Sequence, residues 1–141
     1  MAAPAPLSAS RFRVEFDGLL LTSVSRVVLP CEQLRTVLHG TGDDDPPRTI
    51  TAGLVAPQHF VVSRGVTTDT ELWDWCRDAR DGAGTARSAA VVVLDASGSE
   101  QVRWNLSACD PVGYWVSPLD AKGTEVLTET LCMTTRSMDR H

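Results

Sequence analysis

The sequence lacks the features of a membrane or secreted protein. No apolar run in its 141 residues approaches the roughly 18–20 residues that a membrane-spanning helix needs. Residues 1–10 lack the basic start and apolar centre of a secretory signal. We therefore expect assembly in the cytoplasm without membrane insertion. In that compartment the cysteines are expected to be reduced and buried, and they lack zinc-site spacing; they are Cys31, Cys76, Cys109 and Cys132.

Motifs of catalysis and nucleotide binding are also missing. The sequence contains no P-loop, no GxGxxG after a predicted strand and no HExxH pair. Carboxylate pairs occur at Asp43/Asp44 and Asp69/Glu71, but a solvated loop and a helix cap explain them better than acid–base chemistry. No Ser-His or Cys-His pattern surrounds the histidines, which are His39, His59 and His141. These absences predict a protein that is not an enzyme and uses no cofactor or metal.

The charge balance excludes a further class of partner. A formal net charge of −5 and a pI near 5.0 argue against nucleic acid as the partner of the whole surface. The length suits one hydrophobic core. We expect a single domain over residues 11–141, preceded by a flexible Ala/Pro/Ser-rich arm at residues 1–10.

The sequence does contain short segments typical of β-strands. Residues 11–16, RFRVEF, alternate apolar and polar side chains, and the turn dipeptide Asp17-Gly18 follows. They predict a hairpin over residues 12–29, which Pro30 ends. Further strands are predicted at 33–38, 50–55 and 60–63.

The second half predicts another hairpin, with a Val-rich strand to Leu94, a turn at 95–99 and a return strand through Trp104. The continuous apolar run at 90–94 indicates a strand covered on both faces, by the helix on one side and by another chain on the other. Residues 109–116 are predicted to form an irregular edge segment. Residues 124–134 are predicted to form a long terminal strand.

The one predicted helix begins at Thr68. Thr68-Asp69-Thr70-Glu71 matches a capping box, in which Thr68 and Glu71 would satisfy exposed backbone donors. Gly82 and Gly84 are expected to end the helix. Its apolar stripe, with Trp73 at the edge, consists of Leu72, Trp75, Cys76 and Ala79.

Together these elements predict a mainly β (α+β) fold, an antiparallel β sandwich or partly open barrel with one flanking α-helix. Such a sheet has edges that invite pairing with other chains. Arg64, between a strand and the helix cap, is expected to form a local salt bridge with Asp69 or to reach a neighbouring subunit. The expected core residues are Phe12, Phe16, Leu72, Trp75 and Trp104.

One polar loop stands apart from this pattern. Residues 39–48, HGTGDDDPPR, hold three consecutive aspartates and two prolines and offer nothing to a core. The acidic triplet lacks the spaced oxygen ligands of a calcium loop. We expect a solvated loop, or one that becomes ordered against another subunit.

The ordered set of motifs resembles a known family. The motifs are F-x-V-x-F-D-G at 12–18, S-R-G at 63–65, D-x-E-L-W-D-W at 69–75, V-V-V-L-D at 91–95, V-R-W-N-L at 102–106, Pro111, P-L-D-A at 118–121 and E-V-L-T-E-T-L at 125–131. Over about residues 11–133 the chain resembles the tail-tube proteins of contractile phages. It also resembles the inner-tube proteins of phage-tail-like contractile injection systems.

This resemblance implies a structural subunit that forms hexameric rings, which stack into a hollow tube. The implied partners are further copies of the chain, a sheath protein, baseplate and tube-initiator proteins, and cargo in the lumen, either DNA or a protein effector. A tail-tube-like domain would lie within a virion tail or a phage-tail-like particle. The Thr-rich last strand, with Thr128 and Thr130, is the candidate lumen lining. The candidate inter-ring loop includes Gly40, Asp43, Asp44, Asp45 and Arg48.

Two alternatives remain open. The loop at 39–48 is shorter and more acidic than the family pattern, and the ending TTRSMDRH lacks the acidic, glycine-containing end often found there. The ending suits a specialised tube initiator at the baseplate, with the same fold. A small-ligand-binding β barrel is a second alternative, suggested by the tryptophans.

Overall fold

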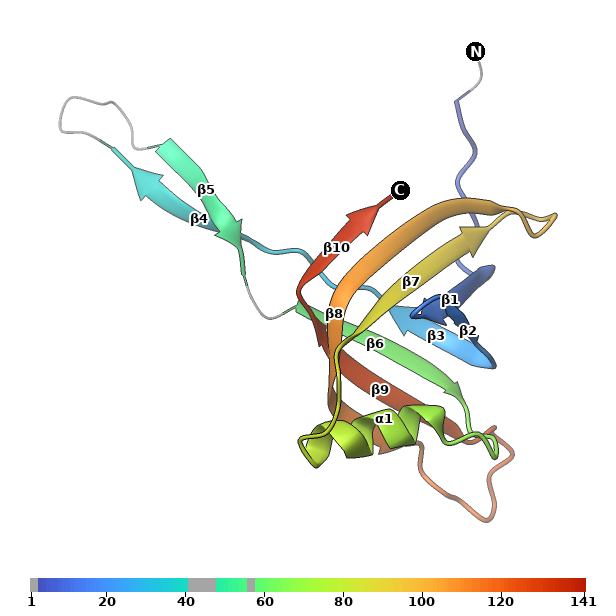
Figure 1. The fold of residues 1–141 in the computed structure, drawn as a ribbon. Helices are drawn as coiled ribbons and strands as arrows, with labels where there is room; N and C mark the ends of the chain where they lie inside the picture. Colours follow the sequence, from blue (N-terminus) through green and yellow to red (C-terminus); the bar gives the residue numbers. More distant parts are fainter. Residues whose placement is uncertain (1–2, 41–47, 56–57) are drawn as a thin grey trace.

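The computed structural model describes residues 3–40, 48–55 and 58–141. Within these ranges the chain forms ten strands and one α-helix (Figure 1). In chain order they are β1 (Phe12–Phe16), β2 (Leu19–Leu21), β3 (Val24–Val28), β4 (Leu34–His39), β5 (Arg48–Leu54), β6 (Gln58–Gly65), α1 (Glu71–Arg80), β7 (Arg87–Leu94), β8 (Glu100–Val116), β9 (Thr128–Thr135) and β10 (Ser137–Arg140). No helix among these residues is long and apolar enough to cross a bilayer.

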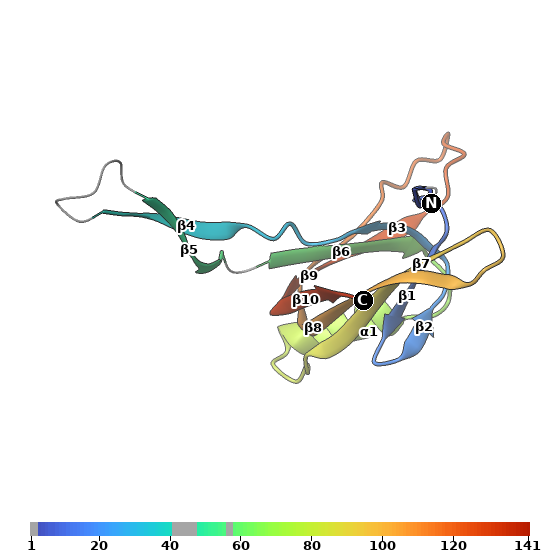
Figure 2. The ribbon, with the colours of Figure 1, turned by 90° about the horizontal axis from the view of Figure 1, so that it is seen from above.

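Eight strands form one antiparallel arrangement in the order β2-β1-β7-β8-β9-β6-β3, with β10 also paired to β8. It folds into two facing layers (Figures 1 and 2). The first sheet holds β2, β1, β7, the first half of β8 and β10. The second sheet holds the second half of β8, β9, β6 and β3. The mainly β fold with one helix, predicted from the sequence, is confirmed for the described residues.

The long strand β8 joins the two layers. Its residues up to Cys109 pair with β7, and those from Asp110 pair with β9. Ala108, with φ 50°, has a left-handed backbone at the change of partner. The prediction of an irregular edge segment at 109–116 is confirmed in that residues 110–116 pair only with β9 at one edge of the second sheet, with a register shift between Pro111 and Gly113.

The first hairpin is shorter than predicted. β1 and β2 pair across the turn at Asp17 and Gly18, which both have positive φ. β3 then leaves β2 and pairs with β6 in the second sheet. Ser23, with φ 63°, lies at this change of direction. The predicted hairpin over 12–29 is thus divided between the two layers.

The predicted terminal strand is also corrected. β9 begins only at Thr128, where its pairing with β6 starts. Further back the chain turns at residues 120–123: the Asp120 side chain accepts a hydrogen bond from Lys122 N at 3.0 Å, and its carbonyl accepts one from Gly123 N at 3.0 Å. We call residues 117–127 the β8–β9 loop. After β9 the chain adds a further strand, β10, along β8.

The helix starts later than the capping box predicts. Its N-cap is Thr70, which makes no side-chain cap bond, and the Asp69 carboxylate accepts the Glu71 N–H at 2.9 Å. The capping box at Thr68 and Glu71 is therefore wrong. Arg64 donates to the Asp69 carbonyl at 3.2 Å, which holds this residue outside the helix. The Glu71 carboxylate lies 3.8 Å from the Arg87 guanidinium instead.

The helix seals one side of the space between the layers. Leu72 and Trp75 are buried, and the Trp75 ring meets Phe16 edge to face with centroids 5.2 Å apart. Past the helix end, a Cβ on Gly84 would stand 2.8 Å from the Ala79 backbone, so only glycine fits there. Among the expected core residues, Phe16, Leu72 and Trp75 are buried, while Phe12 and Trp104 pack against the core half-buried.

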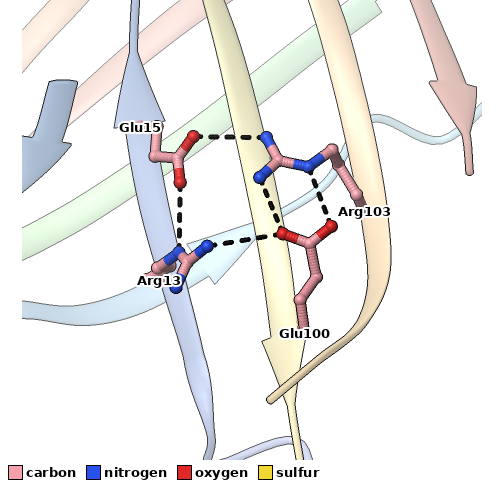
Figure 3. A network of polar contacts seen from close by, with 4 residues as sticks. All are labelled: Arg13, Glu15, Glu100 and Arg103. Atoms are coloured by element: carbon pink, nitrogen blue, oxygen red, sulfur yellow. Dashed lines mark hydrogen bonds and ion pairs between the residues drawn. The ribbon is translucent and has the colours of Figure 1, made fainter. Parts of the chain in front are cut away.

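The Val-rich strand β7 is covered on both faces, but not in the way predicted. Val92 faces away from the core and is nevertheless fully buried. Its neighbours across the sheet are Arg13 on β1 and Arg103 on β8. Together with Glu15 and Glu100, these arginines form a closed ring of ion pairs over the strand (Figure 3). The chain itself supplies the cover that was expected from another chain.

Candidate assembly surfaces

The β4–β5 hairpin stands apart from the sandwich. It forms a separate two-stranded sheet that projects from the body (Figures 1 and 2). All six residues of β4 are exposed, and Leu38 is 75% exposed. Isolated two-stranded hairpins are marginally stable in water. Apolar side chains on such a hairpin are therefore available to another molecule.

In the structure, the two ends of the predicted loop at 39–48 belong to strands. His39 and Arg48 are paired strand residues at the end of the hairpin, and Gly40 follows β4. Residues 40–47 fall between the two strands in the sequence, and of these the structure describes only Gly40. The predicted inter-ring residues Asp43, Asp44 and Asp45 lie outside the described residues.

The outward face of the second sheet is rich in small and hydroxyl side chains. Thr128 and Thr130 lie on this face of β9, beside Gly65 and Ser63 of β6, and of the two threonines Thr130 is only 8% exposed. The Thr130 and Ser63 hydroxyls are 2.8 Å apart. Trp115 of β8, 52% exposed, is the large apolar side chain on the same cross-strand row. The row ends at Arg26 of β3.

Each layer has two edge strands among the described residues, and in addition to β2 and β3 these are β10 and the second half of β8, each paired on one side. β2 and β3 stand at the two ends of the strand order, each paired on one side. Unpaired edges present backbone donors and acceptors to other chains. The fold therefore offers sheet edges at which a neighbouring copy can add strands.

A buried charged cluster ties the helix start to the second sheet. Arg64 is 1% exposed, and its Nε lies 2.7 Å from Glu129 Oε1. The Tyr114 hydroxyl donates to the other Glu129 oxygen at 2.6 Å. Burial, together with the hydrogen bond to Glu129 and its charge, raises the pKa of Tyr114 to about 12. Arg64 also lies 3.6 Å from Asp69, as predicted, in addition to the pair with Glu129.

Sequence reasoning missed Glu129 as the main partner of Arg64. The two residues are 65 positions apart and meet only because β6 and β9 pair. A signal was present, since Glu129 interrupts the apolar face of its strand. A carboxylate at a core-facing position needs a cation and hydrogen-bond donors beside it, because burying an unpaired charge is costly.

An apolar groove opens between the two sheets at one end of the sandwich. It has a volume of about 380 Å³ and lies beside the N-terminal arm. Arg140 stacks over Trp104 at its rim, with its guanidinium carbon 5.9 Å from the ring centroid. The apolar lining comes mainly from Phe12, Val27, Leu29, Val91, Val93, Val102 and Trp104.

The structure shows little reactive chemistry. Among the residues that it describes, no group of three or more His, Cys, Asp or Glu side chains is placed to hold a metal ion. The four cysteines are free thiols. Burial raises the pKa of Cys109, which lowers its thiolate content. Cys31 is exposed, so the prediction that all four thiols are buried is wrong for this residue.

A comparison with protein families agrees with a chain that exposes a hairpin and open sheet edges. The family model described as T4-like virus tail tube protein gp19 matches residues 8–139. The chain belongs to this tail tube family. It is a structural tube subunit of the kind found in contractile phage tails and injection systems, which confirms the resemblance drawn from the sequence motifs. No match is found among curated protein sequences.

Solved structures share the fold of this tail tube chain at low sequence identity. A chain of the anti-feeding prophage tube terminating cap has a TM-score of 0.89 and 14% identity over 100% of this chain and 94% of that one. A chain of the sheath–tube complex of PVC, an extracellular contractile injection system, has a TM-score of 0.86 and 15% identity over 96% and 91%. Hcp1 from Flavobacterium johnsoniae has a TM-score of 0.61 and 18% identity over 92% and 94%.

The sequence motifs that carry the resemblance to tail tube proteins lie where one element of the fold leads into the next. The motif at 12–18 forms β1 and its turn, and the motif at 63–65 ends β6 with Arg64 in the buried cluster. The motif at 69–75 starts the helix with Asp69, Leu72 and Trp75. These motifs set the shape of the subunit, whereas the hairpin and the sheet edges are left to contact other molecules.

Proposed function

We propose that the tail tube chain forms hexameric rings that stack into the inner tube of a phage-tail-like particle, assembled in the cytoplasm. The observation that carries this proposal is the family match over residues 8–139, in a fold that leaves sheet edges and a hairpin unpartnered. Similar chains occur in solved structures of a sheath–tube complex and of a baseplate. A sheath protein, baseplate proteins and a tube initiator are therefore the proposed partners, and the role is structural, not catalytic.

Ring formation would close the open edges. A neighbouring copy adding its strands beside β3 would convert an exposed edge into a continuous sheet. The outward face of the second sheet would then line the lumen, with Thr128 and Thr130 among its side chains. A surface of hydroxyls and small residues suits the passage of cargo, because it offers few large apolar contacts.

Stacking of rings would use the hairpin. Its exposed apolar strands, with Gly40 and Arg48 at the far end, would reach the adjacent ring together with Asp43, Asp44 and Asp45. The cargo that passes the tube would be a protein effector or DNA. The neighbouring genes distinguish these cargoes, since capsid and terminase genes indicate a phage, whereas sheath, baseplate and ATPase genes without them indicate an injection system.

Electron microscopy of the purified protein tests the proposal. We expect six-fold rings that stack into tubes at high protein concentration, and the same chain within the native particle. A protein that stays monomeric at high concentration and is absent from particles would contradict the proposal. Counting the copies per particle separates a bulk tube subunit from an initiator, because an initiator occupies only one or two rings.

A small-ligand-binding barrel is the competing function, and the groove of about 380 Å³ is its natural site. Trp104 lines this groove, so a bound apolar ligand would change tryptophan fluorescence. We expect a pool of apolar metabolites to leave the fluorescence unchanged. A saturable change that Trp104→Phe abolishes would favour the binding function instead.

A further inference from the structure

We propose that the N-terminal arm, residues 3–10, is a strap that closes over the apolar groove by seating the Leu7 side chain between the two sheets. The occupant of the groove is then a segment of the same chain, and closure requires no other copy. Four observations support this device: the position of the arm, the space in the groove, the composition of the arm and its attachment.

The arm already lies along one side of the groove. Leu7, Ser8 and Ala9 belong to the groove lining, whereas Leu7 remains 43% exposed. The chain continues into β1, where Phe12 forms part of the apolar wall. The helix α1, which seals the space between the layers on its own side, lies far from the arm (Figure 1). A closed arm would give the open end of the sandwich a cover of its own.

The groove offers apolar surface and room for a side chain. Its volume of about 380 Å³ is far larger than the roughly 30 Å³ share of one water molecule. The charged lining residue, Arg140, lies over Trp104 at the rim, so the interior is left to apolar contacts. Seating Leu7 there would remove apolar surface of the arm and of the groove from water, which is favourable.

The composition of the arm suits closure. Residues 1–10, MAAPAPLSAS, carry no charged side chain, so closure buries no unpaired side-chain charge. Pro4 and Pro6 restrict the backbone, which lowers the entropy cost of ordering the arm. Leu7 is the one large apolar side chain between these prolines and β1, and it is therefore the anchor of the strap.

The arm is attached to the body at one end. Ser10 N donates to the Ser8 hydroxyl at 3.2 Å, and the two hydroxyls are 2.8 Å apart, which forms a local turn ahead of β1. Leu94 N donates to the Arg11 carbonyl at 2.8 Å and fixes the chain where β1 begins. Residues 3–9 can therefore change position without breaking the pairing of a strand.

Closure would also support an edge strand. Val27 of β3 and Leu29, directly after it, form the groove wall on the side of the second sheet. β3 is paired with β6 on one side only. A seated Leu7 would pack against both side chains and hold β3 to the body. It would also occupy the space that a small apolar ligand needs, so binding of an apolar dye reports an open strap.

The dye anilinonaphthalene sulfonate, which brightens on exposed apolar surface, tests the strap in the unassembled protein. Deletion of residues 2–8 should raise the dye fluorescence severalfold over that of the full chain, and Leu7→Ser should raise it by a smaller factor. The matched control is Leu119→Ser, at a side chain that is 83% exposed on the β8–β9 loop. It should leave the fluorescence of the full chain unchanged.

Two outcomes of the dye experiment would overturn the strap. The first is equal fluorescence of the full chain and the deletion variant, which would show that the arm does not cover the groove. The second is an increase in Leu119→Ser as large as that in Leu7→Ser. All variants are compared at the same circular dichroism and urea midpoint, so that the dye reports the groove and not unfolding.

Disulfide trapping tests closure with the arm intact. In a Cys31→Ser background, which removes the exposed native thiol, dilute Leu7→Cys/Leu29→Cys protein should form an intramolecular disulfide and migrate faster on a non-reducing gel. The control is Leu7→Cys/Val28→Cys, because Val28 lies on the outward face of the second sheet and is 41% exposed. It should cross-link severalfold less.

Equal yields in the two variants, or no disulfide in either, would contradict closure. Both experiments use the unassembled chain. A protein that forms no rings would therefore reject the proposed tube function and leave the result for the strap unaffected.

Discussion

The sandwich body and the β4–β5 hairpin use similar apolar residues in opposite ways. In the body, Val62 and Leu131 face each other across β6 and β9 and are fully buried by their own chain. In the hairpin, Val37 and Ile50 also face each other, but both are exposed. Apolar burial stabilises a fold only where the chain itself supplies the cover. The body therefore carries the stability of the subunit, and the hairpin leaves its apolar surface uncovered by its own chain.

This difference separates folding from assembly within one chain. Substitutions in the body should lower the free energy of unfolding of the monomer, whereas substitutions in the hairpin should change assembly and leave that free energy nearly unaltered. Substitutions in the two regions, with effects on monomer stability that range from several kcal/mol to nearly none, test this separation.

Trp75→Ala is expected to destabilise the monomer most. Trp75 is buried, meets Phe16 edge to face, and donates from Nε1 to the Thr85 carbonyl at 3.1 Å. Its removal should lower the free energy of unfolding by about 3–5 kcal/mol, measured by urea denaturation. Trp73→Ala is the matched control, because Trp73 lies on the same helix but is 38% exposed. Equal losses in the two variants would contradict the assignment of Trp75 to the core.

Arg64→Met should follow, because it leaves Glu129 buried without its cation. The expected loss is about 3 kcal/mol in the same assay, at the lower end for a broken buried pair, since Tyr114 still donates to Glu129. The double variant Arg64→Met/Glu129→Met should recover most of the stability, because no unpaired charge remains. A double variant as unstable as the single one would show that Arg64 acts through packing and not through charge.

Tyr114 reports on the same cluster through its pKa. It is the one tyrosine in the sequence, so absorbance near 295 nm follows its ionisation alone. We expect a folded-state pKa of about 12, against about 10 in the unfolded chain. Because the folded state favours the neutral phenol, this stabilisation is complete below about pH 10 and is lost as the pH rises towards 12.

Glu129→Gln provides the control for this titration. It removes the negative charge beside the phenol but keeps the residue's size, so the pKa of Tyr114 should fall while staying above 10, since burial is the largest cause of the shift. A Tyr114 pKa near 10 in the folded protein, or one that Glu129→Gln leaves unchanged, would contradict the cluster geometry.

Local patterns in the sequence predicted the body well and its connections less well. Alternation in RFRVEF and the Asp17-Gly18 dipeptide predicted β1 and its turn, because both depend on neighbouring residues. The passage of β8 from one sheet to the other and the pairing of Arg64 with Glu129 depend on contacts between distant residues, and no local pattern encodes them. The helix start was misplaced for the same reason, since Arg64 holds Asp69 outside the helix.

The hairpin was predicted only in part, for a different physical reason. Strands at 33–38 and 50–55 were expected, and β4 and β5 occupy these regions. Composition alone did not show that they would pair with each other away from the body. The exposed position of Leu38 becomes evident only in three dimensions, so the assembly surface is the part of the candidate site that the sequence left least determined.

Leu38→Ser is expected to alter monomer stability least and assembly strongly. Because Leu38 is 75% exposed, the free energy of unfolding should change by no more than about 0.5 kcal/mol. Tube formation, measured by sedimentation of the same preparation, should fall severalfold, since the hairpin loses an apolar contact with the next copy. Leu19→Ser, at a side chain of similar exposure on β2, should leave both stacking and stability nearly unchanged. If Leu38→Ser instead unfolded the monomer, the hairpin would contribute to the fold of its own subunit, and the separation of folding from assembly would not hold.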